Sequence, residues 1–332
     1  MNKNIIKVAL CLVLGAGLFI ALSRVPVLSE DKKQAEPEAQ EPEAEPAKGG
    51  DQPAQKVLDN MTYSRKADYS TMSRLIQEDV VLLGCRDDDP EGYEDQVQEV
   101  MKALSISYTG VTRQELETYN FSKTAALLCN CSEQGVSQKA ADNIKTFLAK
   151  GGYLFATDWA IDGVIRKVAP GSLKSLGMGS QQGKQMTMVS PFEKNKEHLF
   201  LRGVFPKDKP SLQWMLDQGF KYYSAEKPEN VTVLIVGDEK MKKEYRTDLV
   251  VVCWIYNGKG GYNPKFNEEQ QSKTGDYLTK RAKQGVIMYV NSHFYMQKVG
   301  LKDVQGNSSM YQLIANFLID AKLAKNARLQ KK

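Results

Sequence analysis

The chain has 332 residues, of which 42% are hydrophobic, so it can bury one large core or two smaller ones. Its formal net charge is +5, and no basic stripe with interleaved aromatic residues occurs, so the composition argues against nucleic-acid binding. The five cysteines are too widely spaced for a small disulfide scaffold or a zinc ribbon.

Residues 1–29 predict a signal peptide or an N-terminal membrane anchor. Two lysines precede an uncharged run from Val8 to Ser23, which is short for a spanning helix of about 20 residues. The run reaches that length if it continues through Arg24 to Leu28, whereas Ala21-Leu22-Ser23 fits a cleavage site, so both alternatives stay open. In either case we expect export, to the periplasm or the cell surface.

Residues 30–56 predict a disordered, extended linker. This stretch consists mainly of Glu, Pro, Ala, Gln and Lys and has almost nothing to bury. We expect it to hold a folded domain, predicted over residues 57–324, away from the membrane. Residues 325–332 are expected to form a basic tail.

Short apolar runs alternate with helical segments in the first half of the chain. Because β-α-β crossovers join parallel neighbours, this alternation predicts an α/β fold with a flavodoxin-like, doubly wound, mostly parallel sheet and helices on both faces. The expected strands are Val80–Cys85, Ile106–Val111, Ala125–Cys129 and Tyr153–Thr157. The expected helices are Tyr93–Leu104, a segment from Thr112 to Tyr119 that begins with a Thr112/Glu115 capping box, and Ser137–Lys150.

The pattern becomes looser after Val168. A short helix is also expected earlier, at Thr71–Glu78, and Gly171–Gln185 predicts a long loop. The later predicted elements are strands at Val231–Val236, Leu249–Tyr256 and Val286–Val290, and an amphipathic closing helix at Met310–Leu323 with a fraying, lysine-rich end.

Ligands of open parallel sheets bind beyond the carboxyl ends of the strands. The residues that end or follow the predicted strands are therefore the ligand-binding candidates, namely Cys85, Asp87, Cys129, Cys131, Asp158, Trp159, Ser292 and His293. Asp158 and His293 are also the candidates for catalysis. We predict no cofactor and no bound metal.

The cysteines leave three alternatives open. Cys85, Cys129 and Cys131 end or follow strands that are neighbours in the flavodoxin-like order, so the three sulfurs are expected at one edge of the sheet. They fit a nucleophilic or metal-binding thiol, a disulfide of Cys85 with Cys129 or Cys131, or small apolar filler in the core.

The remaining polar candidates carry weaker patterns. Asp87 and the two acids after it could bind Mg²⁺, but cysteine stands where the partner carboxylate is expected, which favours a solvated turn. His198 lies in a Lys- and Glu-rich segment and is expected on the surface, whereas His293 follows a buried strand, where a general base could lie. No phosphate-binding loop has the required spacing.

Four segments together resemble the class I glutamine amidotransferase-like superfamily, especially its trehalose-utilisation (ThuA-like) branch and related exported proteins. They are VVLLGC, the run from AALLCNC to FLAKGGYLFATDW, EHLFLRGVF with Leu199 where proline is usual, and GVIMYVNSHFYMQ with Ser292 at a glycine position. The resemblance covers roughly residues 78–322 and implies an amidotransferase-like fold.

One departure from that resemblance concerns the reaction. Active members place a nucleophilic cysteine on a sharp turn after the strand that matches Tyr153–Thr157, and this chain has Asp158 there without a G-x-C-x-G sequence. Glutaminase chemistry needs a thiolate on that turn. The resemblance therefore implies the fold and argues against amide transfer.

The leading hypothesis is a membrane-tethered or secreted extracytoplasmic domain that is catalytically silent. It would bind a small molecule, a glycan or a protein partner at the strand ends. One alternative is a hydrolase or carbohydrate-active enzyme that uses Asp158 and His293, with or without a metal. Another is an interaction module of an envelope complex, for which a broad exposed apolar patch would be the sign.

Overall fold

The computed structural model describes residues 52–85, 97–131, 134–178, 185–216, 221–225, 231–245, 250–257, 285–292 and 304–330. All of them belong to the unit that runs from Lys48 to Lys332. The predicted signal or anchor, Asp87 and His293 lie outside the described residues. Within the described ranges, no helix has both the length and the apolar character needed to cross a membrane.

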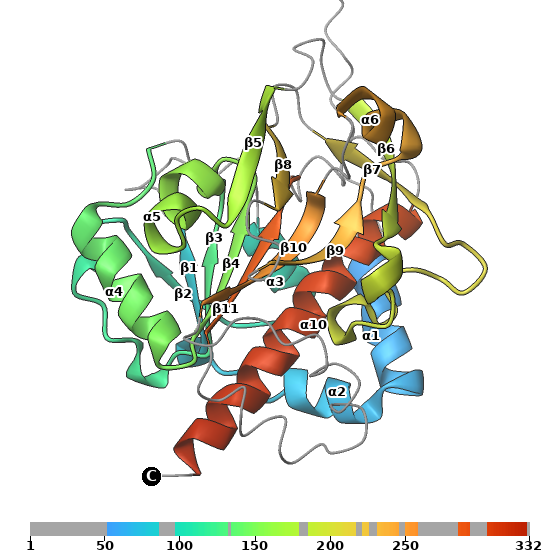
Figure 1. The fold of residues 1–332 in the computed structure, drawn as a ribbon. Coiled ribbons are helices and arrows are strands. Elements are labelled where there is room, and N and C mark those ends of the chain that lie inside the picture. Colours follow the sequence, from blue (N-terminus) through green and yellow to red (C-terminus); the bar gives the residue numbers. More distant parts are fainter. Residues whose placement is uncertain are drawn as a thin grey trace, which may run out of the picture. The chain divides into compact units, whose positions relative to one another are not determined.

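The central sheet has the strand order β2-β1-β3-β4-β11-β10-β9-β6-β7 (Figure 1). The first five strands in this order run parallel, and β10 continues the sheet in antiparallel pairing towards β9, β6 and β7. The order β2-β1-β3-β4 is that of a flavodoxin-like sheet, so the predicted fold class is confirmed. The strands are β1 (Val80–Leu83), β2 (Thr109–Val111), β3 (Ala126–Cys129), β4 (Tyr153–Thr157), β6 (Gln185–Pro191), β7 (Leu212–Leu216), β9 (Val231–Val236), β10 (Val250–Asn257) and β11 (Gly285–Val290).

Helices cover both faces of this sheet because alternate strand residues supply an apolar core to each face. Val80 and Leu82 face the core shared with α1, α2, α3 and α10, whereas Val81 and Leu83 face the core shared with α4 and α5 (Figure 1). The helices are α1 (Gln52–Ser64), α2 (Lys66–Met72), α3 (Val97–Ala103), α4 (Gln138–Ala149), α5 (Arg166–Val168), α6 (Glu239–Tyr245) and α10 (Val304–Leu329). Short turns of 3₁₀-helix are η1 (Gln77–Asp79), η3 (Glu115–Glu117), η4 (Phe121–Lys123), η6 (Glu193–Asn195) and η7 (Leu199–Leu201), and η5 (Ile161–Ile165) is a π-helical turn.

The β3-α4-β4 unit agrees closely with its prediction. The hydroxyl of Ser137 caps α4 by accepting a hydrogen bond from the Ala140 N–H at 3.2 Å. The apolar residues that recur at helical spacing in α4 are all buried, namely Ala140, Ala141, Ile144, Phe147 and Leu148. Gly151 ends the helix with a φ of 84°, the left-handed conformation that glycine adopts without strain. The predicted parallel pairing of β3 with β4 is confirmed.

The closing helix α10 corrects two expectations. It runs from Val304 to Leu329 rather than from Met310 to Leu323, and its residues from 308 to 321 are all buried, so it is not amphipathic. Its lysine-rich end does not fray, since Lys325 is buried and paired with Asp79. The physical reason is that α1 and α2 cover the polar side of α10, which the sequence suggested would face solvent (Figure 1).

The sequence did not predict helices at α1 or over most of α2, the two helices that cover α10. Residues 52–56 were expected in the linker, but α1 begins at Gln52 and already buries Ala54. Ala54, Val57 and Met61 follow helical spacing and are all buried against the core that contains α10. The expected helix at Thr71–Glu78 is replaced by the end of α2 and the separate turn η1.

Three shorter predictions also need correction. Gly171–Gln185 is not a loop throughout, because β5 (Leu173–Met178) pairs with β8 (Lys221–Ala225) and β6 begins at Gln185; strand pairing outweighs the polar composition here. The strand expected at Ile106–Val111 is shorter and begins at Thr109. The Thr112/Glu115 capping box is confirmed by hydrogen bonds of 2.8 and 3.2 Å, but it starts a turn of 3₁₀-helix rather than a helix that reaches Tyr119.

His198 is buried, with 6% of its surface exposed, so the expectation that it lies at the surface is wrong. Its Nδ1 atom accepts a hydrogen bond from the Phe200 N–H at 3.3 Å, and its ring packs against the Phe200 ring with centroids 5.1 Å apart. Phe200 in turn contacts Phe317 of α10. The charged residues that precede His198 in the sequence suggested an exposed segment, although His198 and Phe200 are both buried.

Candidate functional site

The carboxyl ends of β1, β3, β4 and β11 meet at one edge of the sheet. Leu83 pairs with Cys129, Cys129 with Ala156, and Thr157 with Val290, so these neighbouring strands end at the same level. The residues that end or follow these strands are the ligand-binding candidates from the sequence. Those within the described residues are Cys85, Cys129, Cys131, Asp158, Trp159 and Ser292.

Asp158 occupies a strained turn between β4 and the helical segment that begins at Ala160. Its φ of 35° is positive, which L-residues other than Asn and Asp rarely adopt. Its backbone N–H donates to the carbonyl of Val290 in β11 at 2.9 Å, so the neighbouring strand holds the turn in place. The turn therefore has the strand, left-handed residue and helix arrangement of a nucleophile elbow, and the side chain on it is a carboxylate.

A close backbone contact supports the segment after this turn. Gly135 has a φ of 65°, and a Cβ atom at that position would lie 2.3 Å from the Cα of Gly163 in η5. The Val136 N–H donates to the Gly163 carbonyl at 3.1 Å, and Lys167 donates to the carbonyl of Val136. The loop after β3 and the helical segment after β4 are thereby fixed to each other.

The carboxylate of Asp158 meets a thiol. The Sγ of Cys131 donates to Oδ2 of Asp158 over 3.7 Å, and the two residues are 9% and 3% exposed. The two candidates that the sequence placed after β3 and β4 are therefore in direct contact. Trp159, the next residue, is half-buried at the same edge. A carboxylate, a thiol and an indole are suited to hold polar and apolar parts of a ligand.

The three sulfurs do not form one group. Cys129 is fully buried in the core on the α4 side, and burial raises the pKa of its thiol to about 12, so it serves as apolar filler. Cys85 is half-buried and packs against the core on the opposite face, with its Sγ 3.5 Å from the Leu82 carbonyl. Gly84, with a φ of 75°, turns the chain between Leu83 and Cys85. All three cysteines are unbridged in the structure.

Asn130 is a buried polar residue at this edge that was not among the candidates from the sequence. It lies between Cys129 and Cys131, is 1% exposed, and its side-chain amide forms three hydrogen bonds. An asparagine after a strand ordinarily indicates a solvated turn, so the sequence carries no sign of this role.

Asn291 and Ser292 follow β11, whose last residue Val290 accepts from the Asp158 N–H, and both are buried. Tyr289 donates to Oδ1 of Asn291 at 3.2 Å. Ser292 is therefore placed at the predicted edge, whereas His293 and Asp87 lie outside the described residues. Within the ranges that the structure describes, His, Cys, Asp and Glu side chains form no group of three that could hold a metal ion.

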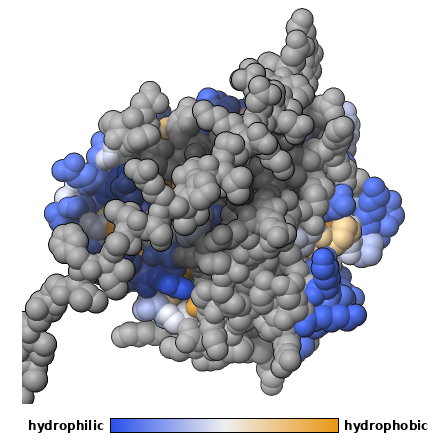
Figure 2. Space-filling view, turned by 90° about the horizontal axis from the view of Figure 1, so that it is seen from above, coloured by the Kyte–Doolittle hydropathy of each residue, from blue (hydrophilic) through white to orange (hydrophobic). Residues whose placement is uncertain are grey.

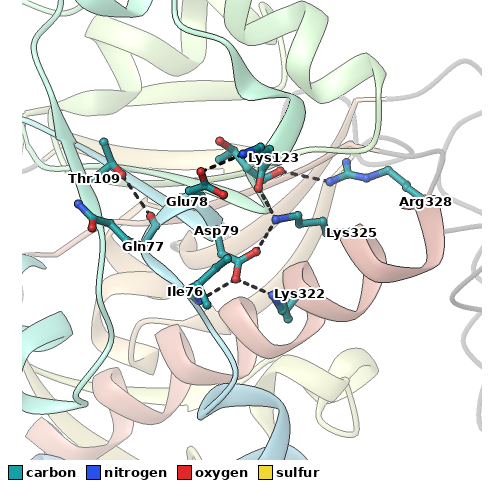
Figure 3. Close-up of polar contacts among 10 residues, drawn as sticks. Ile76, Gln77, Glu78, Asp79, Thr109, Lys123, Lys322, Lys325 and Arg328 are labelled. Atoms are coloured by element: carbon teal, nitrogen blue, oxygen red, sulfur yellow. Dashed lines mark hydrogen bonds and ion pairs between the residues drawn. The ribbon is translucent and has the colours of Figure 1, made fainter. Parts of the chain in front are cut away.

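A second polar cluster lies at the opposite, amino edge of the sheet (Figure 3). The fully buried carboxylate of Asp79 accepts from Lys322 and Lys325 of α10 at 2.6 Å each and from the Ile76 N–H at 2.8 Å. Burial alone would raise the pKa of Asp79, but these three donors hold it below its ordinary value. Arg328 extends the contact to the Lys150 and Thr124 carbonyls. This cluster fastens α10 to the sheet.

The described surface has few exposed large hydrophobic side chains. In the view from above, its described part is mostly hydrophilic, with small separate hydrophobic areas (Figure 2). The exposed large hydrophobic residues are Tyr63, Tyr69, Ile76, Met188 and Leu329, spread over several elements. Among the described residues there is thus no broad apolar patch of the kind that an interaction module would present.

No protein-family model matches the chain, and no curated protein matches it. Solved structures that it resembles include a ThuA-like protein from Bacteroides uniformis ATCC 8492, with 13% identity over 72% of this chain and 89% of that chain and a TM-score of 0.42. A glutamine amidotransferase from Thermotoga maritima has 10% identity over 72% and 97%, with a TM-score of 0.39. A β-galactosidase from Rahnella sp. R3 has 12% identity over 73% of this chain and 31% of that chain, with a TM-score of 0.44. Similarities of this size carry no argument about activity or ligand.

Proposed function

We propose that the protein is an exported, membrane-tethered or secreted binding domain with an amidotransferase-like fold. It binds a small molecule, a glycan or a protein partner at the carboxyl edge of its sheet and does not hydrolyse glutamine. The export part of the proposal rests on the composition of residues 1–29 and 30–56. The binding part rests on the Asp158 turn.

The single observation that carries this proposal is the backbone of Asp158. A left-handed residue that is not glycine, between a buried strand and a helical segment, costs about 1–3 kcal/mol and is typical of functional sites. The fold thus keeps the sharp turn that presents a nucleophile in active amidotransferases, but the side chain on it is a carboxylate. Attack of a carboxylate on an amide would give an anhydride, a poor intermediate beside a thioester, so the turn is suited to binding.

The absence of glutaminase chemistry is tested with the full-length chain in detergent. We expect no ammonia release from glutamine above the buffer background for the wild-type protein or for Asp158→Asn. Ammonia release by the wild-type protein that Asp158→Asn abolishes would refute the silent-domain proposal.

Ligand binding is tested by thermal unfolding of the same full-length protein with separate sets of sugars, amino acids and nucleotides. A ligand present at 100 times its Kd adds about 2.7 kcal/mol to stability, which raises the Tm of a domain of this size by roughly 5–10 °C. We expect one set to raise the Tm of the wild-type protein and to lose this effect in Trp159→Ala. A shift that Trp159→Ala leaves unchanged would place the ligand elsewhere.

Export is tested separately in the producing cell. We expect protease added outside the cytoplasmic membrane to digest the folded domain, and a chain lacking residues 1–29 to stay protected in the cytoplasm. Protection of the full-length chain from external protease would contradict export.

One alternative function has an observation in its favour. The strained turn at Asp158 is also the geometry of a nucleophile, and carboxylates act as nucleophiles in glycoside cleavage. A hydrolase or carbohydrate-active enzyme would use Asp158 with His293 as its base. Cleavage of nitrophenyl glycosides or esters that is lost in both Asp158→Asn and His293→Ala would establish it.

A further inference from the structure

We infer that Asn130 is the positioning residue of the carboxyl edge, which holds the Cys131 thiol against the Asp158 carboxylate. This inference rests on the proposed function, because it assigns the residue that shapes the same site. The argument starts from the unusual number of contacts made by one buried amide.

The side chain of Asn130 joins three segments. Its Oδ1 accepts from the Val97 N–H at 3.1 Å, where α3 begins, and its Nδ2 donates to the Gly84 carbonyl at 2.8 Å, just after β1. The same Nδ2 donates to Oε1 of Gln98 at 3.0 Å. The backbone N–H of Asn130 donates to the Leu83 carbonyl at 3.2 Å. No other side chain can replace this set, because it needs two donors and one acceptor on one short planar group.

The contacts of Asn130 determine where Cys131 lies. Asn130 is 1% exposed, and its side chain and backbone are both held, so the chain leaving β3 has one direction. Cys131 is the next residue, and its thiol donates to the Asp158 carboxylate at 3.7 Å. The amide therefore fixes the thiol, and the thiol fixes one oxygen of the carboxylate on the strained turn.

Cys129 and Cys131 together allow local opening of the carboxyl edge to be distinguished from global unfolding. Cys129 is the last residue of β3 and lies two residues before Cys131; it is fully buried, and its thiol has a pKa of about 12. Alkylation of Cys129 therefore reports the opening of the sheet, whereas alkylation of Cys131 reports the opening of the edge alone.

The test is mass spectrometry of the full-length chain during alkylation with iodoacetamide, with fragment ions that assign the label to Cys129 or to Cys131 within their shared peptide. In Asn130→Ala we expect the rate at Cys131 to rise about tenfold, while the rate at Cys129 stays within about twofold of wild type. Asp158→Asn should also raise the rate at Cys131, because the thiolate no longer faces a negative charge. The double variant should gain less than the product of the two single effects, since both act on one contact.

A matched control comes from another asparagine. Asn143 of α4 donates its amide to the Leu116 and Tyr119 carbonyls at 2.8 and 3.0 Å, contacts that involve neither Asn130 nor Cys131. Asn143→Ala should leave the ratio of the Cys131 rate to the Cys129 rate unchanged. Gln98→Ala, which removes one of the contacts of Asn130, should raise the Cys131 rate by less than about threefold.

Three results would overturn the inference. One is an equal rise at Cys129 and Cys131 in Asn130→Ala, since Asn130 would then only stabilise the fold. The second is an unchanged rate at Cys131, and the third is independent, multiplicative effects of Asn130→Ala and Asp158→Asn. None of these rates depends on a bound ligand, so their outcome is separate from that of the ligand-binding test above.

Discussion

Removal of the Asp79 carboxylate should destabilise the fold more than any other single change at the amino edge. Asp79→Ala leaves the ammonium groups of Lys322 and Lys325 without their shared anion, and these side chains are only 12% and 8% exposed. It also leaves the Ile76 N–H without its acceptor (Figure 3). Because α10 passes through the core, loosening its end should weaken the whole domain.

The expected loss is about 3 kcal/mol in the free energy of unfolding. Breaking a buried ion pair by removing one partner costs about 3–5 kcal/mol, and we take the lower value because Lys325 also contacts the Lys123 carbonyl. Glu78→Gln is the matched control, since its ion pair with Lys123 joins side chains that are 53% and 70% exposed. An exposed pair contributes about 0–1 kcal/mol, so this variant should behave almost like wild type.

The assay is equilibrium unfolding of the full-length chain in urea at several pH values. The pKa of Asp79 is lower in the folded protein than in the unfolded chain, so its contribution is present above pH of about 4 and is lost as the pH falls through the folded pKa. The stability difference between wild type and Asp79→Ala should therefore shrink at acidic pH. A difference below about 0.5 kcal/mol at neutral pH, or one that grows on acidification, would refute this account of the cluster.

Three further changes test the packing around both edges. Asp158→Val should lower the free energy of unfolding by more than about 2 kcal/mol, because β-branched residues rarely adopt a φ of 35°. Asp158→Asn should change it by less than about 1 kcal/mol, and equal effects of the two variants would contradict the claim that the backbone at position 158 is strained. Gly135→Ala should lower the free energy of unfolding in urea by about 3 kcal/mol, because its Cβ would lie 2.3 Å from the Gly163 backbone. An unchanged free energy of unfolding would show that the two segments can move apart to accept the methyl group. Tyr153→Phe should cost about 2 kcal/mol because the Tyr153 hydroxyl donates to the buried Asp320 carboxylate at 2.6 Å; Tm measurements on both proteins decide this.

The sequence was sufficient to predict at which edge of the sheet the candidate site lies, but not which side chains contact each other there. The alternation of apolar runs and helical segments was sufficient to place Cys131, Asp158 and Ser292 after neighbouring parallel strands, because such strands end together. The contact between Cys131 and Asp158 was not predictable. It depends on the φ of 35° at Asp158, and an aspartate in the sequence does not indicate that its backbone is left-handed. The role of Asn130 was not predictable either. A buried asparagine whose amide makes three hydrogen bonds has the same local sequence pattern as an asparagine in a solvated turn.

The sequence by itself determined the order and direction of the first four strands and the capped helix between β3 and β4, because periodicity, caps and crossover handedness are local or nearly local properties. Only the tertiary structure decided which polar residues are buried. Gln312, Asn316 and Asp320 form a polar stripe on α10 that suggests a solvent-facing side, yet they bond to Asn60, Arg65 and Tyr153. Their partners are more than 160 residues away along the chain, and no local pattern reports a contact at that separation.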